Sequence, residues 1–145
     1  MIRRDESVII DVVTRAMVPI IQIFAFYVIF HGHYSPGGGF QGGALLAGSV
    51  LLQRVVFGRD RSQGGFPSRL GIPFGILGVF IYSGTGLWAQ LSGGNFLQYD
   101  ALPLGFDAAM LRNTGILLVE IGVGFAVMGI LISIFDDLVE GGLRR

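Results

Sequence analysis

Cysteine is missing from this chain of 145 residues, and lysine is missing as well, since all ten basic residues are arginine. Without cysteine there can be no disulfide, no thiolate metal site and no cysteine nucleophile, so we expect no redox chemistry on the chain. The acidic residues also number ten, which gives a net charge of zero. Because no broad basic surface is indicated, we expect no nucleic-acid partner.

Charged residues of either sign are scarce. They make up 14% of the chain against 52% hydrophobic residues, and the mean hydropathy is +0.67. A helix needs about 20 apolar residues to cross a bilayer, and four segments meet this requirement: 8–30, 40–57, 71–91 and 114–135. The sequence therefore predicts an all-α integral membrane protein with four transmembrane helices in a single membrane domain, 1–145. Arg15 interrupts the first apolar run, which we interpret as a retained helix and not a cleaved signal peptide.

The arginines are distributed unevenly about the four predicted spans. One of them, Arg112, falls in a loop on one side of the membrane. The other nine lie on or near the opposite side: Arg3, Arg4, Arg15, Arg54, Arg59, Arg61, Arg69, Arg144 and Arg145. The positive-inside rule then places both ends of the chain in the cytoplasm, N-in and C-in.

Glycine is abundant, at 24 residues, and much of it lies inside the spans with small residues four apart. Helices in lipid associate through close backbone approach, which small residues permit. Three pairs of this kind are Gly39 with Gly43, Ala44 with Gly48, and Gly71 with Gly75. We expect other membrane subunits around this chain, while a self-contained bundle is the alternative.

The connection between the first two spans reads HGHYSPGGGFQGG, from His31 to Gly43. An ordinary hairpin does not need so much glycine, and proline followed by glycines indicates an irregular backbone that approaches its neighbours closely. Irregular backbone at membrane depth is allowed only where protein or a water-filled cavity satisfies its amides. We predict a structural glycine-rich loop or re-entrant start made by seven residues: Pro36, Gly37, Gly38, Gly39, Phe40, Gly42 and Gly43.

With this motif the whole chain resembles a known family, the B subunit of Mrp-type multisubunit sodium/proton antiporters. Segments 15–19 and 118–123 support the resemblance. The resemblance implies a four-helix subunit of the prokaryotic inner cell membrane that has no cofactor, contacts other subunits of the complex and the lipid bilayer, and helps to exchange Na⁺ for H⁺. Related small subunits belong to membrane-bound hydrogenase and sulfane reductase complexes, so a redox-driven ion pump is the alternative host. A purely structural scaffold is a further alternative.

Glu120 is the first candidate for an ion-pathway residue. It lies about 6 Å from the middle of the fourth span at 1.5 Å per residue. A carboxylate at this depth costs about 2.5 kcal/mol or more, so it is expected to be protonated, paired or hydrated. The functional interpretation is a proton or sodium site, and the alternative is a hydrogen bond that ties this helix to a partner.

The other candidates are weaker. Asp11 and Arg15 have the i,i+4 spacing of an ion pair, which favours an anchor over an ion site. For His31 and His33 we rank loop-ordering hydrogen bonds before a proton relay, and no metal site is expected. Gln41 is expected to act as interhelical glue or to line a hydrated route.

No catalytic constellation is present in the sequence, so we expect a transporter-complex subunit and not an enzyme. The loop 92–112 contains three aromatic residues and is predicted to form a cap on the outer face. Three acidic residues near the end of the chain are predicted to be solvated: Asp136, Asp137 and Glu140.

Overall fold

The computed structural model describes residues 8–32, 37–62 and 65–143. Within these ranges the chain is helical and contains no β-strand, so the predicted all-α fold is confirmed. Four helices are long and apolar enough to span a membrane. They are α1 (Val8–Phe30), α2 (Gly39–Phe57), α4 (Gly71–Leu91) and α5 (Ala108–Leu143); the short elements are α3 (Arg59–Ser62), η1 (Ser68–Leu70) and η2 (Tyr99–Ala101).

Helix α5 is much longer than the apolar segment 114–135. It has 36 residues and starts inside the region expected to be loop. Asp107 caps its first turn, because its carboxylate accepts a hydrogen bond from the Met110 amide at 2.8 Å, an arrangement that satisfies an otherwise unpaired helix amide. At its other end the helix continues past Phe135 to Leu143. Hydropathy alone marks the apolar length of a helix and not its hydrogen-bonded length.

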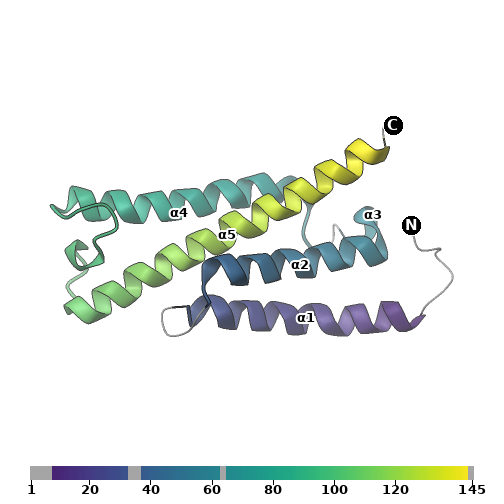
Figure 1. Cartoon of the computed structure of the whole chain (residues 1–145), viewed down its shortest axis with the longest axis horizontal. Helices are drawn as coiled ribbons and strands as arrows, with labels where there is room; N and C mark the ends of the chain where they lie inside the picture. The colour runs from purple at the N-terminus through teal and green to yellow at the C-terminus, as the bar shows by residue number, and fades with distance from the viewer. Residues whose placement is uncertain (1–7, 33–36, 63–64, 144–145) are drawn as a thin grey trace.

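The four long helices lie in a row, in the order α1, α2, α5, α4 (Figure 1). Each helix of the row packs on its neighbour, and α5 also touches α1. Among the described residues, no Cα atom of α4 lies within 8 Å of a Cα atom of α1 or α2. The fold is therefore an open layer centred on α5 and not a closed four-helix bundle.

Small residues let α5 touch its two main neighbours through backbone. On the α4 side, a Cβ atom added to Gly78 would collide with the backbone of Gly122 and Ala126. On the α2 side, a Cβ atom on Gly43 would lie 2.5 Å from the Gly124 carbonyl oxygen. These contacts confirm close helix approach at Gly43 and Gly78, which is how helices associate in lipid. Gly48, which was predicted to serve in the same way, makes no such contact within the described residues.

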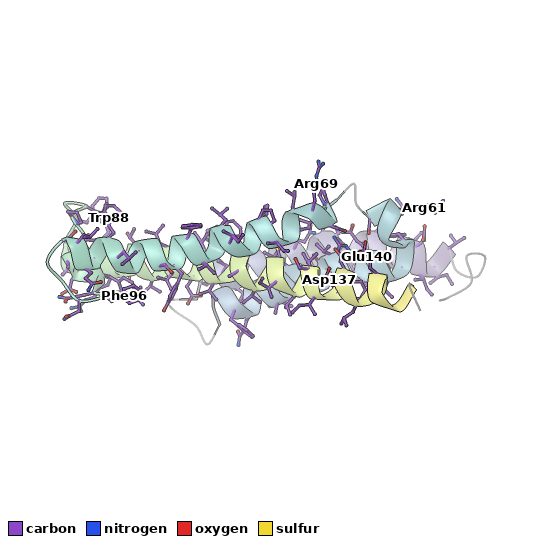
Figure 2. The ribbon with its side chains drawn as sticks, turned by 90° about the horizontal axis from the view of Figure 1, so that it is seen from above. Arg61, Arg69, Trp88, Phe96, Asp137 and Glu140 are labelled. Carbon is purple, nitrogen blue, oxygen red and sulfur yellow. The ribbon has the colours of Figure 1, made fainter. Side chains whose placement is uncertain are left out.

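The two ends of the molecule differ in composition. Figure 2 shows Trp88 and Phe96 at one end and Arg61, Arg69 and Asp137 towards the other. The start of α1 and the end of α5 both lie at the arginine-bearing end (Figure 1), as an even number of crossings requires. Basic residues gathered at one end are typical of a membrane protein whose two faces are chemically distinct.

Candidate functional site

Helix α2 begins beside the body of α5 and not level with either of its ends (Figure 1). The residue before it, Gly38, has φ +156° and ψ −159°, a region of backbone space that is essentially restricted to glycine. Its carbonyl oxygen accepts the first helical hydrogen bond, from the Gly42 amide at 2.9 Å. The glycine-rich motif thus starts a helix beside the body of α5, further along it than a hairpin level with the start of α5 would do.

Glu120 on α5 meets this helix start. It lies twelve residues after the first residue of α5, which is about 18 Å along the helix. The amide of Gly39 donates a hydrogen bond to its carboxylate Oε2. Cβ atoms on Gly38 and Gly39 would collide with Glu120, and one on Gly32 would lie 3.0 Å from its Cδ. Three glycines therefore surround Glu120: Gly32 after the end of α1, and Gly38 and Gly39 at the start of α2. We call this place, where α1 gives way to α2 beside Glu120, the corner.

The geometry favours negative charge at this point. The first amides of a helix lack intrahelical acceptors, and the helix dipole places partial positive charge there. A carboxylate at such a position is stabilised by up to about 2 kcal/mol when partly buried. The structure therefore supplies electrostatic compensation for a charge that lipid alone would not tolerate.

A pocket of about 310 Å³ opens beside Glu120. The described residues that line it come from the corner, from α2 and from α5: Gly37, Gly38, Gly39, Phe40, Gln41, Val119, Glu120 and Val123. Glu120 is the one ionisable side chain among them, and Gln41 is exposed at the start of α2. The pocket is large enough to hold water beside the carboxylate.

The predicted loop candidate His31 lies apart from the Glu120 pocket. His31 follows α1, with its ring stacked on Tyr27 at 4.2 Å between centroids and its Nδ1 3.1 Å from the Tyr27 carbonyl oxygen. It is exposed and does not line the Glu120 pocket. His33 and Pro36 lie outside the described residues. Within the described ranges, no group of three or more metal-ligating side chains is gathered.

Asp11 and Arg15 lie at the other end of the molecule from Glu120, near the start of α1. Their side chains pair at 3.6 Å with the predicted i,i+4 spacing, and both are largely exposed. The Arg15 guanidinium carbon also lies 5.1 Å from the centroid of the Phe57 ring on α2. These contacts fit an anchor between α1 and α2, and the structure does not bring this pair to the Glu120 corner.

An ion pair between Arg54 and Asp136 was not anticipated from the sequence. The Asp136 carboxylate, expected to be solvated, forms an ion pair with Arg54 on α2, and the two side chains are 5% and 1% exposed. Arg54 also donates to the Phe66 carbonyl oxygen at 3.0 Å. The expectation of solvation is wrong for Asp136 because α5 extends further than its apolar segment. Asp137, the next residue, is exposed.

The spacing of residues along α5 is the sequence signal that could have indicated that Asp136 faces α2. Asp136 follows a ridge of residues four apart: Glu120, Gly124, Met128, Ile132 and Asp136. Positions spaced by four lie on one face of a helix. Gly124 contacts the start of α2, and Met128 and Ile132 are buried in the main apolar core. This ridge on the α2 side of α5 therefore has an acid at each of its ends and apolar residues or glycine between them.

Tyr99 in η2, between the membrane-spanning segments, borders the first part of α5. Its ring packs where a Cβ atom on Gly115 would collide with it. Burial raises the pKa of the Tyr99 phenol above its ordinary 10.0, and the negative potential of Tyr82 and Glu120 adds to the effect. The folded protein therefore keeps this phenol neutral at a higher pH than the unfolded chain does.

A pH dependence follows from this raised pKa. As the pH rises from 10.0 through the raised value, the unfolded chain ionises first, so the free energy of unfolding should fall. Tyr99→Phe should remove this part of the decline and leave stability near neutral pH within about 1 kcal/mol of wild type. The check is phenolate absorbance and resistance to proteolysis, each measured against pH. The prediction is contradicted if the stability of Tyr99→Phe falls with pH as steeply as that of the wild-type protein.

Comparison with known proteins supports one family over almost the whole chain. Residues 9–133 match the model of a domain described as related to the MnhB subunit of Na⁺/H⁺ antiporter. A protein of Staphylococcus aureus strain MRSA252, named as antiporter subunit mnhB2, is 31% identical over 142 residues, covering 95% of this chain and 98% of its own length. Its counterpart in strain Newman is 30% identical over 139 residues, with the same coverage.

These matches extend beyond the glycine-rich motif to all four long helices. Together with four helices able to span a membrane, they make the chain a multi-pass protein of a prokaryotic cell membrane. The resemblance found in the motif and in the segment around Glu120 is thereby confirmed. The chain belongs to the family of domains related to the MnhB subunit of Na⁺/H⁺ antiporters.

Proposed function

We propose that this chain is a small membrane subunit of a multisubunit Na⁺/H⁺ antiporter in which Glu120 takes up and releases a proton or Na⁺. The family supports the first part of the proposal. The observation that carries the second is the position of the Glu120 carboxylate, at the start of a helix that begins beside the body of α5, and beside a pocket of about 310 Å³.

Two properties of the corner suit reversible binding. The positive end of α2 lowers the cost of an ionised carboxylate, and the pocket gives water or a cation access to it. Helix starts at membrane depth beside a polar cavity are a recurring way to place ions in transporters. An intramembrane acid of this kind is functional unless a structural role explains it fully.

The rival interpretation is that Glu120 has a structural role, and the hydrogen bond from the Gly39 amide to its carboxylate is the observation that favours it. In this view the Glu120 carboxylate caps α2 and fixes it to α5, and no ion binds. Both roles need an acceptor oxygen at this position. Only the transport role needs a group that exchanges a proton or binds a cation.

Glutamine separates the two roles, because its amide oxygen can still accept from the Gly39 amide while it cannot be titrated. We expect Glu120→Gln to assemble normally and to slow Na⁺/H⁺ exchange by about a hundredfold, the lower end of what a positioned proton-transferring group contributes. The measurement is sodium-driven proton movement in vesicles that contain the complex. Co-purification of the other subunits reports assembly.

Asp137→Asn is the matched control, because it removes an exposed acid from the same helix outside the corner. It should leave exchange unchanged. Normal exchange by an assembled Glu120→Gln complex would remove Glu120 from the ion route. If Glu120→Gln assembles and exchanges normally while Glu120→Ala fails to assemble, the structural cap is the correct interpretation.

Partner subunits are part of this proposal. The open row of helices leaves large apolar side chains exposed on its outer helices, among them Ile23 on α1 and Phe80 on α4, each 71% exposed. Neighbouring membrane subunits and lipid would cover these faces. We also propose that the arginine-bearing end lies in the cytoplasm, in the N-in, C-in orientation. The antiporter names of the relatives favour this host over a redox-driven complex.

A further inference from the structure

A second polar cavity lies at the arginine-bearing end, between α1, the end of α2 and α3. Its volume is about 540 Å³. Six residues line it: Arg15, Val18, Gln53, Phe57, Arg61 and Ser62. This cavity shares no lining residue with the Glu120 pocket, and the proposed ion site does not use it.

The lining combines two kinds of chemistry. Arg15 and Arg61 bring guanidinium groups from two different helices, and Gln53 and Ser62 add polar groups. Asp11 pairs with Arg15, whereas no acid whose side chain the structure describes forms an ion pair with Arg61. The cavity therefore keeps a net positive lining.

The rest of the lining is apolar and lies towards the membrane-spanning part of the helices. Val18 is buried one turn further along α1 than Arg15, and Phe57 is the last residue of α2, with its ring facing the Arg15 guanidinium. Figure 2 places Arg61 at the same end as Arg69 and Asp137, opposite Trp88. The cavity is thus situated where an apolar span gives way to the polar end of the molecule.

We propose that this cavity binds the headgroup of an anionic phospholipid, with the phosphate against Arg15 and Arg61 and the first part of the acyl chains against Val18 and Phe57. Arginine presents several donors in a planar fork that suits phosphate oxygens. Basic pockets between transmembrane helices bind anionic headgroups in this way. The charge and the apolar border together favour a lipid over a free anion.

The test uses the purified full chain in detergent, with phosphatidylglycerol as the probe and native mass spectrometry to count bound lipid. Arg61→Gln should weaken phosphatidylglycerol binding by about fivefold, which corresponds to one arginine charge near an anionic surface. Arg61→Lys should keep most of the affinity. Arg69→Gln is the matched control, since Arg69 is exposed at the same end but does not line the cavity.

Two comparisons with other ligands complete the experiment. Zwitterionic phosphatidylcholine should bind less tightly than phosphatidylglycerol, and inorganic phosphate should fail to displace the lipid at comparable concentration. Equal losses in Arg61→Gln and Arg69→Gln would show a diffuse charge effect and overturn the proposal. Equal binding of phosphatidylcholine, or ready displacement by inorganic phosphate, would overturn it as well.

Discussion

Asp136→Ala is expected to destabilise the folded chain by about 3 to 5 kcal/mol. The substitution leaves the Arg54 guanidinium buried without its counter-charge, since its side chain is 1% exposed. Apart from the ion pair, the structure gives the buried Asp136 oxygens no hydrogen-bond partner among the described residues. In Asp136→Ala, Arg54 keeps its hydrogen bond to the Phe66 carbonyl oxygen but has no counter-charge among the described residues, so most of the desolvation cost of its charge is left uncompensated.

Resistance to proteolysis during titration with a denaturing detergent measures this effect. The double variant Arg54→Met/Asp136→Leu is the informative control, because replacing a buried ion pair by apolar residues of similar volume is often neutral. It should recover most of the stability lost in Asp136→Ala. If Asp136→Ala is as stable as wild type, or if the double variant is no more stable than the single one, the ion pair does not have the role assigned to it.

The fold was largely predictable because lipid imposes a simple rule on sequence. Apolar length marked the four long helices, and α1 and α4 match the predicted segments 8–30 and 71–91. The extent of α5 could not be read from hydropathy, because its ends are held by Asp107 and by a buried ion pair instead of by apolar residues. Hydrogen bonds and tertiary contacts extend a helix where composition does not.

The candidate site was partly predictable. Glu120 and the glycine motif were both identified from the sequence, since a charge and a run of glycines are each unusual in lipid. Their contact was not, because it joins residues 81 positions apart through the Gly39 amide. The order of the helices in the row also depends on tertiary structure, which local sequence does not encode.

Gly39→Ala is expected to separate α2 from α5 and to destabilise the chain by about 3 kcal/mol, the upper end of the usual cost of overpacking. A Cβ atom at this position would collide with the backbone carbonyl of Glu120. Backbone in the middle of a long helix cannot rotate away as a flexible side chain can. The same displacement would break the hydrogen bond from the Gly39 amide to the Glu120 carboxylate, so loss of stability and loss of ion exchange should occur together.

Gly48→Ala on the same helix is the matched control, since no atom lies within 4 Å of the added Cβ. In a helix interior alanine is favoured over glycine by about 0.5 to 1 kcal/mol, so this variant should be as stable as wild type or slightly more stable. Opposite signs for the two substitutions would show that steric contact with α5, and not helix propensity, requires glycine at position 39. Equal stabilities would mean that α2 can shift along α5 without cost, and the close corner around Glu120 would then lose its physical basis.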